Sequence, residues 1–363
     1  MDFEQNDNMP GPTEPPGPGP VENAGPGAVE PVLPPGPQPP TGAKPRKTRS
    51  GWKIFWGIVT GFSVLANIAL FMILVGVIAF FAVGERDLFV EEVVEEGPHS
   101  KKIAIVNLGG IIDGRKAYEI TRQLKAVRKD DRVKGLIIRV DSPGGTISGS
   151  DQIYNEIRKF RLRENKPVVA FMQGVAASGG YYTSVACEQI VAEPTVITGS
   201  IGVIMGYLVV EELFEEKLGI QMVTVKSGRK KDWPSMFQSP SEEQLRYLDE
   251  KLIRPAYHRF VEIVAEGRAL LTAEQVKPLA DGSIYTAQEA LDNKLVDSVG
   301  YLDDAILLVK SLANIDRARV VEYRKPFSLY GFLGAEAGSI FKINKNSLYE
   351  LSTPQVLYLW SIY

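Results

Sequence analysis

The chain of 363 residues has one cysteine and two histidines. The single cysteine, Cys187, excludes a disulfide framework within the chain, and its apolar neighbours predict a small core residue rather than a reactive thiol. No cysteine and histidine cluster has the spacing of a zinc site, so no structural metal is expected. Basic and acidic residues nearly balance, 41 against 44, and the net charge of −3 gives no reason to expect a nucleic-acid partner.

Both histidines are poorly placed for catalysis. His99 precedes the first predicted strand, and His258 lies on a predicted helix beside its apolar stripe. We interpret both as structural residues, and a Ser-His-Asp triad is not expected. A nucleophilic serine in this chain would need a different base, for which lysine is the best candidate.

The N-terminal region is dominated by proline and has few large apolar residues. The first 45 residues contain 14 of the 24 prolines, and such a segment cannot bury enough surface to offset its ordering entropy. We expect residues 1–43 to form a disordered cytoplasmic tail. A solvated tail is favoured over one that binds a proline-recognising partner.

A long uncharged run follows this tail. Residues 54–83 contain no charged side chain, and the run is long enough to span a bilayer with some tilt. A cleaved signal peptide has a shorter apolar region and starts closer to the N-terminus, so a transmembrane helix is the better interpretation. Basic residues precede the run and acidic residues follow it, which predicts a single-pass protein of the cell membrane with a cytoplasmic N-terminus. The main domain is then extracytoplasmic.

The rest of the chain divides into three parts. We expect a stalk over residues 84–100, a soluble domain over 101–321 and a C-terminal extension over 322–363. The extension shows no clear period. Docking against another subunit and weak order are both open for it.

The soluble domain alternates between short β-branched runs and helical patterns. This alternation predicts an α/β fold with a largely parallel sheet. A capping box at 241–244 predicts the start of a long helix. The predicted strands are 103–108, 135–140, 168–171, 190–192 and 222–225, and the predicted helices between them are 118–127, 148–160, 180–186 and 209–218.

One serine stands among small residues where a predicted strand gives way to a helix. Within the run 174–182, Ser178 directly precedes Gly179 and Gly180. Small neighbours let backbone and substrate approach the hydroxyl closely, which is typical of a serine nucleophile. This run therefore indicates a candidate active site.

A second glycine turn and a lysine run could complete that site. The turn 141–145 follows a predicted strand, and its N–H groups could join that of Gly179 in an oxyanion hole, although an ordinary β-turn has the same sequence. The run 226–232 is typical of a solvated loop unless one of its lysines turns inward, where burial would lower the lysine pKa. Ser200 could hydrogen-bond such a lysine or be a plain turn residue.

Together these stretches resemble the signal peptide peptidase family of membrane-anchored serine proteases in its short form. The resemblance covers about residues 100–310 and rests on four motifs in order, with a fifth, looser one. The four motifs are Asp141–Gly145, Ala177–Tyr182, Gly199–Val203 and Lys226–Asp232, and the looser one is Ile284–Ala290 with Leu295–Asp297.

The resemblance implies a Ser-Lys dyad on a fold shared with crotonases and caseinolytic proteases. It implies Ser178 as the nucleophile, Lys231 as the general base, Ser200 as the support of that base, and Gly145 and Gly179 as oxyanion donors. It also implies degradation of remnant signal peptides or other apolar unfolded peptides, without a cofactor. The family forms homo-oligomeric rings whose sites can combine neighbouring subunits.

Some departures and alternatives accompany the resemblance. The adjacent pair Lys230 and Lys231 leaves the base open to a shift by one residue, and Ser283, Ala287 and Lys294 stand where the family usually has glycines. The alternatives are a related membrane protease that clips partner membrane proteins and a non-catalytic membrane scaffold. An acyl-CoA hydratase would share the fold but would not need the serine.

Overall fold

The computed structural model describes residues 51–82, 89–324 and 355–360. These fall into an N-terminal unit, which consists of one helix, and a larger α/β unit. The predicted tail over residues 1–43 and most of the predicted C-terminal extension lie outside the described residues.

The N-terminal helix α1 covers Gly51–Ala82. It forms in a run that has no proline and only one charged residue, Lys53. Its segment Gly51–Val77 is long and apolar enough to cross a membrane, and the most apolar stretch of this segment contains no buried residue. A single helix of this kind fits a single-pass membrane anchor.

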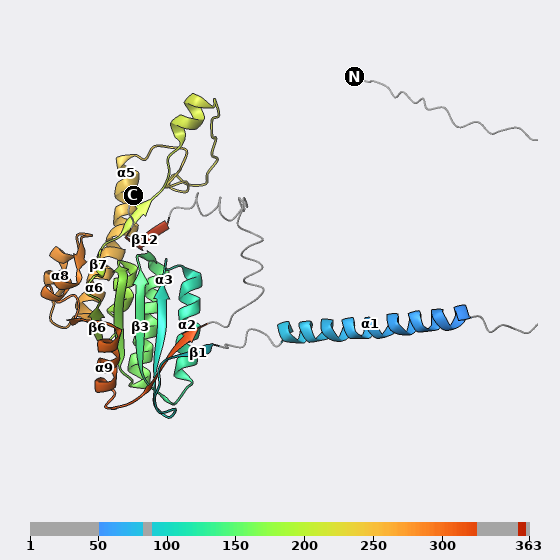
Figure 1. The fold of residues 1–363 in the computed structure, drawn as a ribbon. Coiled ribbons are helices and arrows are strands. Elements are labelled where there is room, and N and C mark those ends of the chain that lie inside the picture. Colours follow the sequence, from blue (N-terminus) through green and yellow to red (C-terminus); the bar gives the residue numbers. More distant parts are fainter. Residues whose placement is uncertain (1–50, 83–88, 325–354, 361–363) are drawn as a thin grey trace, which may run out of the picture. The chain divides into compact units, whose positions relative to one another are not determined.

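A nine-stranded sheet forms the centre of the α/β unit (Figure 1). Its strands are β1 (Val90–Glu95), β2 (Lys102–Gly109), β3 (Val133–Ser142), β5 (Val168–Ala177), β6 (Gln189–Ala192), β7 (Ile197–Gly199), β9 (Ile284–Thr286), β10 (Ser298–Val299) and β11 (Arg319–Arg324). The main path runs β1-β11-β2-β3-β5-β6-β10 and is parallel from β11 onward. Near its C-terminal end β5 instead pairs with β7, which pairs with β9.

The parallel α/β sheet predicted from the sequence is confirmed, and four of the five predicted strands lie in it. The sheet also extends beyond the predicted domain start. Residues in the predicted stalk form β1, which pairs antiparallel with β11. The three valines and three glutamates of β1 do not alternate, which is why the local pattern did not indicate a strand.

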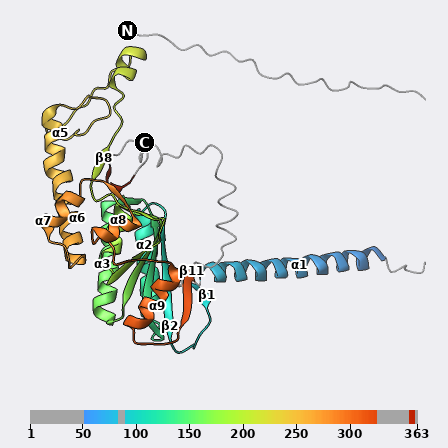
Figure 2. The ribbon, with the colours of Figure 1, turned by 60° about the vertical axis from the view of Figure 1, so that its left-hand side comes forward.

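Helices cover both faces of the sheet (Figure 2). On β2, Ala104 and Val106 join the core that holds the helices of one face, while Ile103 and Ile105 join the core of the other face. Burial on both faces explains why the strands read as continuous apolar runs. The first face carries α2 (Gly114–Arg128), α3 (Ile147–Glu164), α4 (Gly179–Ser184), α6 (Arg254–Gly267), α7 (Ala273–Val276) and α8 (Ala287–Asp292), and the second carries α9 (Leu302–Leu312).

A second, three-stranded sheet lies beside Ser178. It consists of β4 (Gly144–Thr146), β12 (Gln355–Leu359) and β8 (Ile204–Gly206), in the order β4-β12-β8 with both pairs antiparallel. The central strand comes from the C-terminal extension, for which the sequence analysis leaves docking against another subunit and weak order open.

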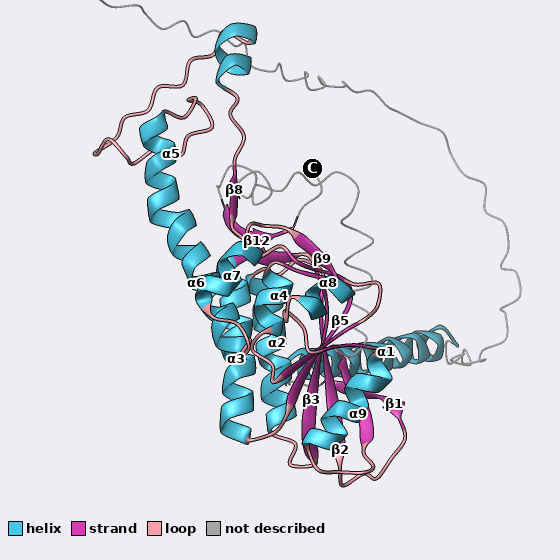
Figure 3. Ribbon diagram, turned by 90° about the vertical axis from the view of Figure 1, so that its left-hand side faces the viewer, coloured by secondary structure: helices cyan, strands magenta, loops and turns pink. Residues whose placement is uncertain are grey.

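Residues 207–241, here called the arm, rise away from the central sheet (Figure 3). The predicted strand 222–225 is wrong, because no strand forms there and Val223 and Val225 are 77% and 96% exposed. The predicted helix 209–218 is reduced to little more than the π-helical turn η1 (Leu213–Lys217). Within the described part of the chain, residues 222–225 pair with no strand.

The long helix that follows the arm begins at the predicted capping box. The Ser241 hydroxyl accepts from the N–H of Gln244 at 3.3 Å, and the Gln244 side chain accepts from the N–H of Ser241 at 2.7 Å. The helix continues through α5 (Glu242–Leu248), the π-helical turn η2 (Asp249–Ile253) and α6. It brings the chain back from the arm to the sheet.

Candidate active site

Ser178 lies at the turn between β5 and α4, where the sequence predicts it. Its backbone has φ 52° and ψ −114°, a conformation that residues with a side chain seldom adopt. The turn is held from both sides: the N–H of Ser178 donates to the carbonyl of Gly199 at 2.8 Å, and the N–H of Tyr182 donates to the carbonyl of Ser178 at 2.8 Å. The hydroxyl caps no N–H of α4, so it is not engaged by its own helix.

Ser178 and Ser200 line one cavity of about 470 Å³. Both are buried, and the N–H of Ser200 donates to the carbonyl of Ser283 at 2.7 Å, which fixes the turn after β7. Asp281 lies on the same wall, and hydrogen bonding from Ser283 lowers the pKa of its carboxyl, so the wall carries a negative charge at neutral pH. The other lining residues are Gly202, Val203, Ile204, Tyr257, Ala280, Gly282, Leu359 and Trp360.

The two glycines of β4 use their backbone groups differently. The N–H of Gly144 donates to the Ser142 hydroxyl at 3.1 Å, and its carbonyl accepts from the N–H of Ile112 at 2.8 Å. Ile112 and Gly145 form a parallel bridge, in which the backbone groups of the two residues flanking Gly145 make the hydrogen bonds to Ile112. The N–H of Gly145 itself is therefore directed toward the opposite edge of β4. Of the two, Gly145 has the N–H suited to a substrate oxygen.

Gly179 packs tightly against this turn. A Cβ on Gly179 would lie 2.4 Å from the Ser150 hydroxyl and 3.1 Å from the Cα of Gly144. A Cβ on Gly144, which has φ 100°, would lie 2.6 Å from the nitrogen of Gly179. Side chains are excluded at both positions, and the fold brings the glycine turn and the serine turn together, as the sequence predicts.

The three lysines of the run 226–232 belong to the arm, and none of them lines the Ser178 cavity. Lys226 is ion-paired with Asp232 at 2.7 Å. The Lys230 ammonium lies 4.1 Å from the centre of the Tyr247 ring. Lys231 is exposed, and within the described part of the chain its side chain has no hydrogen-bond or ion-pair partner. Within one chain the structure therefore does not bring Lys231 to Ser178.

Neither histidine lines the cavity. His99 contacts Arg319, with 2.6 Å between His99 Nδ1 and Arg319 Nη1, and His258 packs edge-on to the ring of Tyr257. The described residues contain no group of three or more His, Cys, Asp and Glu that could hold a metal ion.

Sequence reasoning missed the residues that β12 brings to the site. Leu359 and Trp360 line the Ser178 cavity, and the N–H of Trp360 donates to the carbonyl of Pro143 at 2.8 Å. The only local signal is a short β-prone run, 355–359, that follows Pro354.

This serine site on a Clp-protease-like fold is that of a serine peptidase, and comparison with known proteins agrees. The family model of Clp protease matches residues 99–192, and that of peptidase family S49 matches residues 161–316. The chain belongs to peptidase family S49, the family of the signal peptide peptidase SppA. The resemblance predicted from the sequence is thereby confirmed.

Curated relatives support this assignment over different shares of their length. A putative signal peptide peptidase SppA of Enterococcus faecium is 40% identical over 245 residues, which are 64% of this chain and 70% of that protein. A putative protease of Synechocystis is 39% identical over 220 residues, 61% of this chain and 77% of that protein. Protease 4 of Salmonella typhi is 34% identical over 241 residues, 64% of this chain but only 38% of that protein.

Proposed function

We propose that this serine peptidase is a membrane-anchored endopeptidase with a Ser178–Lys231 dyad. The observation that carries the proposal is the strained turn at Ser178, whose hydroxyl lines a cavity beside two glycine segments. Backbone strain at a buried serine is typical of a nucleophile that must project toward substrate. The N–H groups of Gly145 and Gly179 are the proposed oxyanion donors.

The proposed base is supplied by the arm of a neighbouring chain. Two of the three lysines in the run are already engaged, Lys226 by Asp232 and Lys230 by aromatic rings, whereas Lys231 has no hydrogen-bond or ion-pair partner among the residues that the structure describes. A lysine acts as a general base only in its neutral form. Entry into the Ser178 cavity of a second chain would remove water from the Lys231 side chain, and such desolvation disfavours the charged form of an amine.

The two other groups at the cavity would act on that lysine in opposite directions. The buried Ser200 hydroxyl could accept a hydrogen bond from Nζ of the incoming lysine and orient it. The carboxylate of Asp281 opposes loss of the proton, but Asp281 is exposed, so water screens its charge.

The proposed reaction proceeds through an acyl-enzyme. Neutral Lys231 takes the hydroxyl proton as Ser178 Oγ attacks the peptide carbonyl, and the N–H groups of Gly145 and Gly179 stabilise the resulting oxyanion. The lysine passes this proton to the leaving amine as the peptide bond breaks. A water molecule, deprotonated by the same lysine, then hydrolyses the ester and restores the Ser178 hydroxyl.

The proposed substrates are remnant signal peptides or similar apolar, unfolded peptides at the extracytoplasmic face of the membrane. Helix α1 supports the membrane location. Basic residues before it and acidic residues after it support a cytoplasmic N-terminus. The relative in Enterococcus faecium, named a putative signal peptide peptidase, supports the substrate class.

Cleavage of a synthetic signal peptide by the full-length protein in detergent tests this proposal. We expect no cleavage by Ser178→Ala or Lys231→Ala, and substantial cleavage by Lys226→Ala and Lys230→Ala. Full activity of Ser178→Ala would refute the assignment of Ser178 as the nucleophile. If Lys230→Ala were the only inactive lysine variant, the general base would be Lys230 instead of Lys231. A correctly folded wild-type protein that cleaves nothing would favour the scaffold alternative.

Mixing variants tests whether the dyad forms between chains. If Ser178→Ala and Lys231→Ala chains assemble randomly, about one quarter of the sites combine an intact serine with an intact lysine. Activity should then return to about a quarter of the wild-type value after the two are mixed, dissociated and reassembled. No recovery in a mixture that has demonstrably exchanged chains would show that both residues must come from one chain.

A further inference from the structure

Ser150 is a fully buried residue in the first turn of α3, which follows directly on the glycine turn of β4. Its hydroxyl has no hydrogen-bond partner among the residues that the structure describes. Other buried hydroxyls of the α/β unit are paired: those of Ser142, Ser184 and Thr198 each donate to a backbone carbonyl, at 2.6, 2.9 and 2.7 Å. Because a buried polar group without a partner costs free energy, we expect Ser150 to find an acceptor in another state of the protein.

The unpaired hydroxyl lies against Gly179, the residue that follows Ser178. A Cβ on Gly179 would lie 2.4 Å from Ser150 Oγ, and that Cβ position is about 2.5 Å from the amide nitrogen of the same residue. Ser150 Oγ and the Gly179 nitrogen are therefore no more than about 5 Å apart. Two donors at such a separation can share one acceptor oxygen that lies about 3 Å from each. The separation thus allows the Ser150 hydroxyl and the Gly179 N–H to bind the same oxygen.

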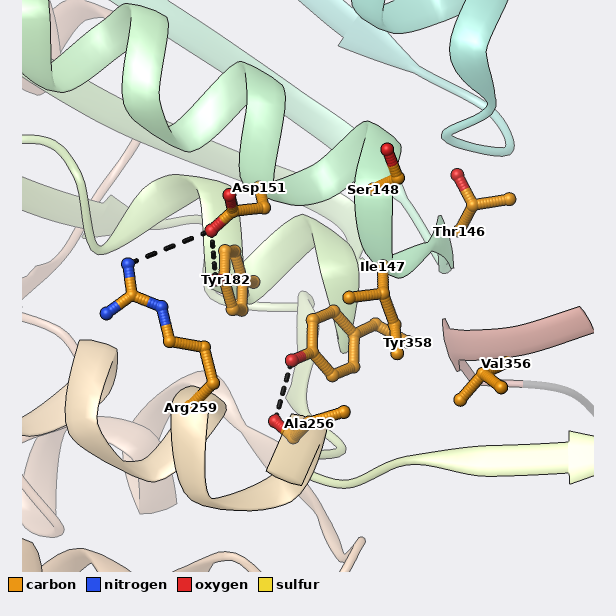
Figure 4. Close-up of a pocket in the computed structure, with 9 residues that line it drawn as sticks. All are labelled: Thr146, Ile147, Ser148, Asp151, Tyr182, Ala256, Arg259, Val356 and Tyr358. Carbon is orange, nitrogen blue, oxygen red and sulfur yellow. Dashed lines mark hydrogen bonds and ion pairs between the residues drawn. The ribbon is translucent and has the colours of Figure 1, made fainter. Parts of the chain in front are cut away.

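Contacts between α3 and α4 hold this arrangement in place (Figure 4). The Tyr182 hydroxyl donates to Asp151, the neighbour of Ser150, at 2.7 Å, and Arg259 lies 3.8 Å from the same carboxylate. The rings of Tyr154 and Tyr182 also pack edge-on, with their centroids 5.5 Å apart. Donors that are fixed before the reaction stabilise a developing charge without reorganising. The Ser150 hydroxyl is held in this way beside the proposed oxyanion site.

We propose that the Ser150 hydroxyl is a third oxyanion donor, beside the N–H groups of Gly145 and Gly179. The inference rests on the proposed role of Ser178 as the nucleophile. As Ser178 Oγ attacks, the substrate carbonyl oxygen becomes an oxyanion, and the O–H of Ser150 rotates to donate to it, while the proton stays on Ser150. When the tetrahedral intermediate collapses, the oxygen loses its charge and this hydrogen bond is lost.

A purely structural role for Ser150 makes a different prediction. A small residue at this position lets α3 approach Gly179 closely, and alanine would serve that purpose as well as serine. Alanine would also remove the unpaired hydroxyl, so the structural role predicts a stable and fully active Ser150→Ala variant. The donor role predicts that the same variant is stable but slow.

Steady-state cleavage of a synthetic signal peptide by the full-length protein in detergent separates the two roles. A hydrogen bond to a charged acceptor is worth about tenfold to a hundredfold, and this one forms only in the transition state. Ser150→Ala should therefore lower kcat by about that factor and leave KM within about twofold. Urea unfolding of the same sample should give a midpoint no lower than that of wild type, because no hydrogen bond of the fold is removed.

The matched control for this measurement is Ser311→Ala. It removes an exposed serine from α9, a helix on the other face of the sheet, and should change neither kcat nor KM. An unchanged kcat in Ser150→Ala would overturn the inference. A lower urea midpoint in Ser150→Ala would also overturn it, because the hydroxyl would then be part of the packing of the fold.

A tetrahedral adduct gives a second measurement that does not depend on turnover. Acetyl-Leu-Ala-Leu aldehyde forms a hemiacetal with a serine nucleophile, and the hemiacetal oxygen occupies the oxyanion site, whereas the corresponding alcohol binds without a bond to Ser178. Ser150→Ala should weaken inhibition by the aldehyde about tenfold or more and leave inhibition by the alcohol within about twofold. Equal weakening of both inhibitors would overturn the donor role.

Failure of this inference is distinguishable from failure of the proposed function. If wild type cleaves the peptide, Ser178→Ala does not, and Ser150→Ala keeps the full kcat, only the third donor is overturned. If Ser178→Ala is fully active, the proposed nucleophile is refuted, and the role of Ser150 is refuted with it.

Discussion

Gly145→Ala is the sharpest structural test of the proposed oxyanion site. A Cβ on Gly145 would lie 2.1 Å from the carbonyl oxygen of Ile112 and 2.6 Å from its nitrogen and carbon. All three atoms are backbone atoms in the middle of a bridge, so no side chain can swing away. Ordinary van der Waals separation requires a shift of about 1 Å or more, which carries the Gly145 N–H away from the substrate oxygen.

The expected consequences differ in size for catalysis and for stability. Loss of one oxyanion donor lowers kcat/KM by about 10²–10³, and overpacking of a close contact costs about 1–3 kcal/mol of unfolding free energy. Cleavage of a synthetic signal peptide measures the first effect. Urea unfolding of the same detergent-solubilised protein measures the second, and shows that the variant assayed was folded.

Alanine substitutions at two other glycines serve as controls that separate the effect of steric crowding from the effect of an unfavourable backbone conformation. Gly110 has φ 72° with no atom within 4 Å of its Cβ position, so Gly110→Ala should cost about 1–2 kcal/mol and leave kcat/KM within about twofold. Gly114 has open space and an ordinary φ, so Gly114→Ala should change neither. If Gly145→Ala retained the kcat/KM of Gly110→Ala, the assignment of the Gly145 N–H to the oxyanion would be refuted.

Two further predictions concern ionisable groups away from the active site. Hydrogen bonds from Arg132 and the buried Lys102 lower the pKa of Asp130, so its stabilising effect is complete above its unfolded pKa and is lost as pH falls through the folded value. Asp130→Asn should therefore lose stability at pH 7 and flatten the fall in stability below about pH 4, whereas the exposed Asp131→Asn should do neither in parallel urea titrations. Burial raises the pKa of Cys187 to about 12, so this thiol should resist DTNB at pH 8 until the protein unfolds, and rapid stoichiometric labelling of the native protein would contradict its burial.

The central sheet could be predicted from the sequence because its strands carry their own signal. Strands buried on both faces, such as β2, β3 and β5, are continuous β-branched runs, and the helices between them show a 3.6-residue period. The structure extends most of these elements beyond their predicted ends, as where the predicted strand 168–171 becomes β5 over Val168–Ala177, whereas the predicted helix 180–186 ends earlier, at Ser184. Local patterns are sufficient where an element packs against its sequence neighbours.

The arm and β12 could not be predicted in this way. The strands that pair with β12 are distant in the sequence, and the described residues contain no partner strand for residues 222–225 of the arm. β12 pairs with strands that lie about 150 and 200 residues earlier in the sequence, and no local pattern encodes such a pairing. The predicted strand 222–225 has a suitable composition, but a strand is stable only with a partner, and the described residues contain none for it. Composition alone could not separate these two outcomes.

The two halves of the proposed dyad differ for the same physical reason. Ser178 could be located from the sequence because the small residues around it determine a local backbone turn, which the structure reproduces with φ 52°. The lysine could not be selected, because Lys226, Lys230 and Lys231 share one loop and one chemistry. Tertiary contacts separate them: Asp232 engages the first, and Trp233 and Tyr247 engage the second, whereas the third has no side-chain hydrogen-bond or ion-pair partner among the described residues. The position of the proposed nucleophile depends on a local backbone turn, which nearby residues determine. The choice of the proposed base depends instead on which lysine forms contacts in the folded arm, and these contacts cannot be read from the local sequence.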